Sequence, residues 1–408
     1  MNGLDETTAL TTAAVLGAFF TVFTTTLVLV PKNATALRLA ATVAMAFLGR
    51  LFGNLLWQIF SRRGYRSNFV MLTCVGLISA SEAVLVSRVD AAELSRTRSH
   101  KGHPQPGTAT LLWRALCLFF NVRRVGTMWE IPYVRRRLQP QSRTRFLATT
   151  LARVVVVYLL VDLLDCAPPP DPRLFAEEKQ TLFHLGRLSA EDVVTRLLVS
   201  AGYWVASFLA IYLNMSVAAL VTVLTGLSRP EAWPRLNGPL SSIYTVRGFW
   251  GSDQTLTRRT RTFWHQSLRI SLTGWAALVS DRILRIRRGT LPSRYLRLFL
   301  AFLLSGVLHC CMDRAFEVAP GDWASVTFFS LQALGIMAED CVQAATADLG
   351  VPAPVRRVVG YAWVMAFLWW STPRWFYPGA RAGDPGDVAP FSILRRLPGV
   401  LGGAEDSK

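Results

Sequence analysis

The chain has 408 residues, of which 51% are hydrophobic and only 17% are charged, and its mean hydropathy is positive. Disordered and ordinary soluble proteins do not fit this composition, because several stretches approach the ~20 apolar residues needed to cross a bilayer. The net charge of +18 comes largely from arginines in short segments between these stretches, without a zinc, helix-turn-helix or RNA-binding pattern. This placement argues against nucleic acid and favours membrane lipids or an anionic soluble substrate as partners.

Nine apolar stretches, taken in chain order, are candidate membrane helices. They cover residues 8–30, 36–60, 69–86, 111–120, 146–164, 197–227, 295–312, 323–345 and 358–370, of which 111–120 is short. The first has no basic region before it and no cleavage site after it, so we interpret it as a retained span. We expect an all-α, polytopic transmembrane protein with about 8–9 spans, in which residues 1–408 form a single domain.

Proline and glycine mark the predicted breaks between helices. Residues 167–172 contain four prolines, which end the preceding helix because proline cannot continue it. Residues 377–390 are rich in glycine and proline and are predicted to be a loop. We therefore expect residues 377–408 to form a flexible tail.

The distribution of charge predicts which helix ends face the cytosol. Residues 121–145 hold seven arginines and one glutamate, and residues 247–297 are also rich in arginine, whereas residues 171–192 and 313–322 are balanced or acidic. The positive-inside rule places the two basic segments in the cytosol and the other two across the membrane. Basic residues follow both the first and the second predicted helix, so the orientation of the N-terminal third stays open.

His309 lies deep in the predicted helix 295–312, roughly 21 Å from its start at a rise of about 1.5 Å per residue. An ionisable side chain at that depth is costly and marks a functional site by default, although it can also be satisfied within the core. Ser305 and Gly306 share its helix face and are small, so a ligand can approach there. Asp313, one turn later, either orients the imidazole or is only the charged end of the helix. We predict that His309 is a base in a tunnel.

Four motifs resemble those of fungal wax synthase-like proteins, which belong to the membrane-bound O-acyltransferase superfamily. RRVGTMWE at 123–130 resembles the family's RGIGTPWE element, and Trp233-Pro234 with Gly238-Pro239 resembles its W-P-x-x-F-G-x-P segment. FWG at 249–251 and FWHQ at 263–266 with Arg269 resemble its FWGR-x-WHQ-x-x-R signature. SGVLH at 305–309 resembles its small-residue-then-histidine motif. The resemblance is strongest over residues 123–345. Residues 252–262 depart from it, because they separate the two halves of the signature.

The resemblance implies transfer of an acyl group from coenzyme A to a hydroxyl of a lipophilic acceptor inside a membrane chamber. His309 would take the proton from the hydroxyl, and burial disfavours the charged imidazole that cannot act as a base. His265, Gln266 and Trp264 are candidate donors to the oxyanion formed on the thioester. The arginines that are candidates to bind the phosphates of acyl-CoA, or only mark topology, are Arg247, Arg258, Arg259, Arg261 and Arg269.

The family resemblance favours acetyl-CoA as co-substrate and a terpenoid or meroterpenoid secondary metabolite as acceptor, in the endoplasmic reticulum membrane. Long-chain alcohols and sterols are the alternative acceptors. We expect no bound cofactor and no metal site, because neither the cysteines nor the histidines have metal-ligand spacing. A transporter or membrane scaffold is the competing class, although no related halves are visible in the chain.

Overall fold

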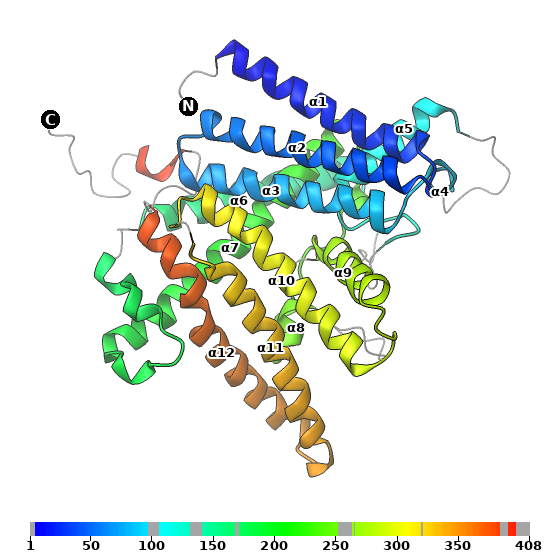
Figure 1. Ribbon diagram of the computed structural model, residues 1–408. Helices are drawn as coiled ribbons and strands as arrows, with labels where there is room; N and C mark the ends of the chain where they lie inside the picture. The colour runs from blue at the N-terminus through cyan, green and yellow to red at the C-terminus, as the bar shows by residue number, and fades with distance from the viewer. Residues whose placement is uncertain are drawn as a thin grey trace.

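The computed structural model describes residues 5–96, 106–130, 141–167, 171–251, 263–264, 266–319, 321–383 and 391–396. Over these residues the protein is built from helices and contains no strand, which confirms the all-α prediction (Figure 1). The long helices are α1 (Glu6–Leu29), α2 (Thr35–Ile59), α3 (Arg63–Ser81), α5 (Thr108–Phe120), α6 (Arg143–Asp165), α7 (Ala190–Leu224), α10 (Leu291–Ala315), α11 (Ala324–Ala345) and α12 (Ala353–Ala382).

Short helical segments connect the long helices. The α-helical ones are α4 (Ala91–Ser95), α8 (Val246–Trp250) and α9 (Arg269–Ala277). Two π-helical turns, η1 (Glu82–Val86) and η7 (Leu278–Ile283), extend α3 and α9. The 3₁₀ turns are η2 (Pro172–Phe175), η3 (Glu177–Gln180), η4 (Leu185–Arg187), η5 (Pro230–Ala232), η6 (Leu240–Ser242), η8 (Ala347–Leu349) and η9 (Leu394–Arg396).

Six of the described helices are long and apolar enough to cross a membrane: α1, α2, α3 with η1, α6, α7 and α10. With 13 residues, α5 is too short to cross a hydrocarbon core of about 30 Å. The helices α11 and α12 have 22 and 30 residues but are not among the six, although we predicted spans at 323–345 and 358–370. Two acidic residues, Glu339 and Asp340, lie within α11, and α12 carries several arginines. The protein is thus a multi-pass membrane protein.

The helix that carries His309, α10, lies in the middle of the bundle (Figure 1). It packs against α3, α9 and α11, while α1 and α2 lie beyond α3, and α12 packs against α7 and α11. A Cβ atom on Gly306 would lie 2.8 Å from the Cα atom of Val326, so α10 and α11 touch backbone to backbone at this glycine. What approaches Gly306 is therefore helix α11, not the ligand for which we expected it to make room.

Polar contacts show how the N-terminal helices are oriented relative to the rest. The guanidinium of Arg38, at the start of α2, donates to the carbonyl oxygens of Val30, Val84 and Val89 at 2.8, 3.0 and 2.9 Å. These atoms lie at the same end of the bundle as Arg124, which pairs with Glu82. We call this the basic end, and it also holds Arg247 and Arg294, which share Asp340.

The opposite end, which we call the far end, holds the start of α3 and the close of α10. Arg66 donates to the carbonyl oxygen of Ala315 at 2.8 Å, and both Arg63 and Arg66 form ion pairs with Glu317 at 2.7 and 2.5 Å. The helix α3 therefore runs antiparallel to α10. The structure thus gives the direction of α3 relative to α10, and Glu317 pairs with the arginines that follow α2.

The helix α12 is longer than predicted, because it continues through Pro373 and Pro378 to Ala382. Residues 377–382 are therefore helical, and the predicted loop and tail begin too early. Tyr377 is buried and meets the ring of Phe175 edge-on at 5.1 Å. Such contacts with the segment that follows α6 offset the backbone hydrogen bonds that proline removes.

Residues 391–396 also contact the bundle rather than extending away from it as a free tail. The carboxylate of Asp162 on α6 accepts hydrogen bonds from the backbone N–H groups of Ile393 and Leu394 at 2.7 and 2.9 Å. The ring of Phe391 packs against Tyr158 with centroids 5.4 Å apart. The rest of the expected tail, 384–390 and 397–408, lies outside the described residues.

Candidate functional site

A cavity of about 1310 Å³ lies inside the bundle, between α3, α7, α9 and α10. This volume exceeds the 300–1,000 Å³ or so of a typical small-molecule site. Its inner wall includes Ser305 and His309 of α10, Phe329 of α11 and Trp375 of α12. The arginines on its wall are Arg124, Arg247, Arg269, Arg282, Arg288, Arg294 and Arg297. The cavity thus connects arginines of the basic end with the buried histidine.

His309 is held by a hydrogen bond within its own helix. Its Nδ1 lies 2.7 Å from the carbonyl oxygen of Ser305. A carbonyl oxygen can only accept, so Nδ1 carries the proton and Nε2 keeps its lone pair. The rings of Phe329 and Trp375 pack on the imidazole, with centroids at 4.4 and 5.1 Å. The neutral tautomer that results has a basic nitrogen on the side of the ring that the backbone does not use.

Asp313, the predicted orienting residue, acts on Trp375. Its carboxylate accepts a hydrogen bond from the Ser325 hydroxyl and another, 3.3 Å long, from Nε1 of Trp375. The indole ring that it holds in this way packs edge-on against His309. The carboxylate is buried beside the site, and its effect on the imidazole passes through the tryptophan. The Ser305 carbonyl supplies the direct contact that we expected from Asp313.

The two halves of the interrupted FWG and FWHQ motifs lie side by side. The backbone N–H groups of Phe263 and Trp264 donate to the carbonyl oxygens of Gly248 and Phe249 at 3.1 and 2.9 Å. The rings of Phe249 and Trp264 stack at 5.4 Å. Residues 252–262 lie outside the described residues. The residues on either side of them are hydrogen-bonded to each other, so the two halves of the motif meet in the fold.

A buried glutamine anchors this aromatic cluster to α11. Trp250 donates from Nε1 to Oε1 of Gln332 at 3.0 Å, and Nε2 of Gln332 donates to the hydroxyl of Ser371 on α12 at 3.2 Å. Gln332 is fully buried, so both ends of its amide are satisfied where water does not reach. Trp250 and Trp264 therefore form a rigid part of the cavity wall.

The remaining predicted site residues divide into three groups. Gln266, Arg269 and Arg247 line the cavity, as Trp264 and Ser305 do. Gly306 packs against α11 instead. The other four predictions fall outside the described residues; they are His265, Arg258, Arg259 and Arg261.

Acidic residues at the basic end bind several of the arginines. Asp340 pairs with Arg247 at 2.5 Å and with Arg294 at 3.2 Å. Asp281 pairs with Arg288 at 3.0 Å and with Arg297 at 3.5 Å. Sequence reasoning missed Arg282, Arg288, Arg294 and Arg297 as cavity residues. They belong to the basic segment 247–297, but nothing in their spacing indicates which of its arginines face inwards.

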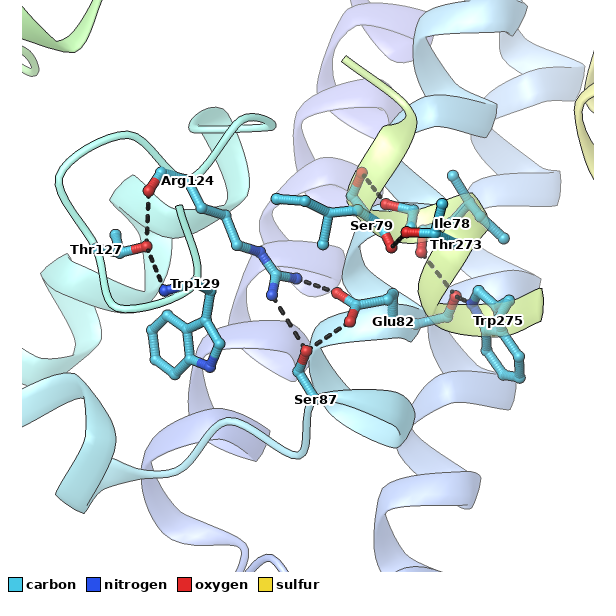
Figure 2. Close-up of polar contacts among 12 residues, drawn as sticks. Ile78, Ser79, Glu82, Ser87, Arg124, Thr127, Trp129, Thr273 and Trp275 are labelled. Carbon is cyan, nitrogen blue, oxygen red and sulfur yellow. Dashed lines mark hydrogen bonds and ion pairs between the residues drawn. The ribbon is translucent and has the colours of Figure 1, made fainter. Parts of the chain in front are cut away.

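Figure 2 shows a second feature that the sequence did not indicate, a buried ion pair between Glu82 and Arg124 on the cavity wall. The hydroxyl of Ser87 donates to Oε1 of Glu82 at 2.5 Å and accepts from Nη1 of Arg124 at 3.2 Å. Arg124 has a left-handed φ of 50°, stabilised by Thr127, whose backbone N–H and hydroxyl donate to the Arg124 carbonyl. The pair joins the RRVGTMWE loop to the end of α3, which fixes that part of the wall.

Neighbouring Arg123 holds the same loop to the segment before α8. Its guanidinium donates to the carbonyl oxygens of Pro234 and Arg235 at 3.0 and 3.1 Å. Burial lowers the pKa of Arg123 to about 10, because desolvation disfavours the charged guanidinium, yet the group stays charged at neutral pH. The backbone N–H of Gly238 in turn donates to the carbonyl oxygen of Phe263 at 3.0 Å, so the segment 233–239 contacts both the RRVGTMWE loop and the FWHQ motif.

Comparisons with known proteins identify the family and several relatives of this chain. A family model described as "Membrane bound O-acyl transferase family" matches residues 233–331. The chain is 31% identical over 330 residues to acetyltransferase spyB of Aspergillus fumigatus, which covers 74% of this chain and 53% of that protein. It is 33% identical over 305 residues to acetyltransferase ataH of Aspergillus terreus, covering 71% and 96%. It is 28% identical over 361 residues to acetyltransferase aurG of Calcarisporium arbuscula, covering 83% of each. The chain spans about half the length of the first relative and nearly all of the second.

Proposed function

Because the chain belongs to the membrane bound O-acyl transferase family, we propose that it transfers an acetyl group from acetyl-CoA to a hydroxyl of a hydrophobic acceptor. The observation that carries this proposal is that one cavity reaches both the arginines of the basic end and His309. The soluble, phosphorylated donor can enter at the basic end, while a lipophilic alcohol can reach the same chamber from the membrane. The relatives' names state acetyl transfer, which favours acetyl as the group that moves.

In the proposed mechanism, Nε2 of His309 accepts the proton of the acceptor hydroxyl as its oxygen attacks the thioester carbon. The new C–O bond forms, the carbonyl oxygen becomes an oxyanion, and the C–S bond then breaks. The proton on Nε2 passes to the departing sulfur, so free coenzyme A leaves as a thiol. The Ser305 carbonyl stabilises the imidazolium that forms between these steps, because it accepts from Nδ1–H throughout.

The oxyanion needs a donor that is already in place when charge develops. Gln266 lines the cavity, and Trp264 is held in place by its backbone hydrogen bond to Phe249. Both observations support a role for these residues as donors to the oxyanion. His265 lies between them in the sequence and is the third candidate. We propose that this short segment stabilises the tetrahedral intermediate.

Arginine is suited to the phosphates of coenzyme A, because its planar guanidinium forms paired hydrogen bonds with phosphate oxygens. Arg247 and Arg269 are the described members of the predicted set on the cavity wall, and Arg288 and Arg297 add to it. The acidic partners Asp340 and Asp281 hold several of these side chains in position in the absence of donor.

We further propose that the acceptor is a terpenoid or meroterpenoid secondary metabolite and that the enzyme resides in the endoplasmic reticulum membrane. Apolar and aromatic side chains dominate the inner wall, which suits a rigid hydrophobic ring system. Long-chain alcohols and sterols are the acceptors against which this choice is to be tested.

The test is transfer of radiolabelled acetyl from acetyl-CoA by microsomes that carry wild type, His309→Ala or His184→Ala. His184 is exposed and does not line the cavity, so its substitution is the matched control. We expect His309→Ala to lower kcat at least about 100-fold, the usual range for losing a general base, and His184→Ala to leave it unchanged. Equal transfer by wild type and His309→Ala at matched protein levels would contradict the assigned role.

The competing class, a transporter, makes a different prediction in the same preparation. A transporter would give no acetylated product from any alcohol, while His309→Ala would abolish solute-dependent proton uptake. Acetylated product that appears with wild type and disappears with His309→Ala would therefore exclude it.

A further inference from the structure

Two asparagine side chains on different helices meet on the cavity wall. Nδ2 of Asn214 on α7 donates to Oδ1 of Asn68 on α3 at 2.9 Å, and Nδ2 of Asn68 faces Oδ1 of Asn214 at 3.5 Å. Both residues line the cavity. Amide side chains within apolar membrane helices are uncommon, and they serve either to join helices or to bind a ligand.

The surroundings of the pair are apolar along both helices. On α3 the residues that line the cavity beside Asn68 are Met71, Leu72 and Val75, which follow it at intervals of three, four and seven and so share one helix face. On α7 the residues that flank Asn214 on the wall are Ala210, Ile211 and Met215. The two asparagines are thus polar residues within otherwise apolar stretches of the cavity wall on α3 and α7.

The asparagine pair also lies close to His309 along the axis of the bundle. Ser67, the residue before Asn68, donates to the carbonyl oxygen of Met312 on α10 at 3.1 Å. Met312 lines the cavity and comes three residues, about one turn, after His309. Asn68 is therefore held at nearly the depth of the imidazole.

The amides retain hydrogen-bonding capacity on the cavity side. Each has two N–H donors and two acceptor lone pairs, and the reciprocal pair uses one of each. Within the described part of the chain the hydrogen bonds of these two amides run to one another. Both side chains are half-buried, so a second N–H and a second lone pair on each stay accessible from the chamber.

We propose that Asn68 and Asn214 form a subsite that hydrogen-bonds a second oxygen of the acceptor, apart from the hydroxyl that is acetylated. This subsite would select alcohols that carry a further carbonyl, ether or hydroxyl over plain alkyl alcohols. A site built to hydrogen-bond a polar group discriminates strongly against analogues without it, since its own polar atoms are then left without that partner. The inference rests on the proposed function, and it narrows the acceptor to oxygenated hydrophobic molecules.

A role in joining α3 to α7 is the alternative explanation, and the chain offers a matched control for it. Ser79, also on α3, forms a side-chain hydrogen bond of 3.2 Å with Ser271 on α9, close to the ion pair shown in Figure 2. Ser79 borders a separate pocket of only about 10 Å³ and does not line the large cavity. Loss of its hydrogen bond therefore weakens a contact between helices without changing the chamber.

The experiment compares acetyl transfer by wild type, Asn68→Leu, Asn214→Leu and Ser79→Ala in microsomes, with radiolabelled acetyl-CoA as donor. Three acceptors are used: a monohydroxy steroid, its derivative with a ketone at the opposite end of the ring system, and hexadecanol. We expect wild type to prefer the hydroxy ketone. Each asparagine variant should lower kcat/KM for that acceptor by roughly five- to tenfold, the size of one neutral hydrogen bond, and change the other two by less than about twofold.

Asn68→Ser keeps a short hydroxyl in place of the amide, so it should retain part of the preference for the hydroxy ketone that Asn68→Leu loses. This variant distinguishes loss of the hydrogen bond from misfolding. The inference is overturned if the asparagine variants lower transfer to every acceptor by one common factor, as Ser79→Ala would. It is also overturned if wild type treats the hydroxy ketone and the monohydroxy steroid alike. Absence of acetyl transfer from wild type to all three acceptors would instead reject the proposed function, and the subsite with it.

Discussion

At the scale of single residues, the Ser305 carbonyl decides which nitrogen of His309 can act as a base. The contact lies within one helix, because a side chain at position i reaches the carbonyl at i−4. The imidazole is therefore oriented by its own backbone, and rings from α11 and α12 hold its plane. Among the described residues, the groups that position the imidazole are thus an uncharged carbonyl and two aromatic rings.

Trp375 is a positioning residue in this arrangement, because it links the carboxylate of Asp313 to the ring of His309. Trp375→Phe keeps a ring but removes the indole N–H, so we expect kcat to fall roughly tenfold while KM changes little. Steady-state kinetics in microsomes measures this split. Trp369→Phe is the control, since Trp369 lies on the same helix and donates to the Val193 carbonyl away from the cavity. An equal fall in kcat for both variants would show that the effect is not specific to the site.

At the scale of elements, the close contact between α10 and α11 places His309 beside Phe329. The contact exists because Gly306 has no side chain and Val326 of α11 occupies the space. Gly306 therefore acts through helix packing, which is a usual role of small residues in membrane proteins. The position of the His309 imidazole therefore depends on how closely α10 and α11 approach each other.

Gly306→Ala tests this packing role. The added Cβ would meet the Cα of Val326 at 2.8 Å, and backbone cannot move aside as a flexible side chain can. We expect the free energy of unfolding to fall by about 1–3 kcal/mol, as for other overpacked sites, and kcat to fall as the imidazole shifts. Thermal unfolding in detergent and acetyl transfer provide the two measurements.

Gly202→Ala is the matched control for that experiment, because nothing lies within 4 Å of the added atom on α7. Its unfolding temperature should be unchanged or slightly raised, since alanine favours helix more than glycine does. A Gly306→Ala protein as stable and as active as Gly202→Ala would contradict the close approach of α10 and α11.

At the scale of the whole molecule, two sets of ion pairs, one buried and one partly exposed, hold the N-terminal helices against the rest of the bundle. Glu82 and Arg124 join α3 to the RRVGTMWE loop at the basic end (Figure 2). Glu317 joins Arg63 and Arg66 of α3 to the end of α10 at the far end. The two attachments lie at opposite ends of α3, so they fix this helix as one wall of the cavity.

The pair at the far end predicts a dependence of stability on pH. The hydrogen bond from Arg66, and then the charges of Arg63 and Arg66, lower the pKa of Glu317 below its ordinary value of 4.5. A carboxyl whose pKa is lower in the folded state contributes stability above pH 4.5 that is lost as the pH falls through the folded value. Glu317→Gln should therefore unfold at a lower temperature than wild type at pH 7, and the difference should shrink below pH 4.5. A difference that is constant across this range would show that Glu317 acts through packing alone.

The sequence by itself determined the helical class and six of the membrane helices, because hydropathy is a local property of the chain. It also placed Trp264, Gln266, Arg247, Arg269 and Ser305 at the site, since these belong to contiguous motifs or to one helix face. It did not reveal that Gly306 packs on α11, that Asp313 acts on Trp375, or that α12 extends to Ala382.

Only the tertiary structure decided which arginines face the cavity, how the N-terminal helices are oriented, and that Asn68 meets Asn214. Each of these depends on contacts between residues far apart in sequence: 146 positions separate the two asparagines and 251 separate Arg66 from Glu317. Local sequence patterns indicate which face of a helix is buried, but they do not indicate which other helix packs against that face. Packing of several helices around one chamber selects those neighbours, because most buried polar groups find their hydrogen-bond partners within the same fold.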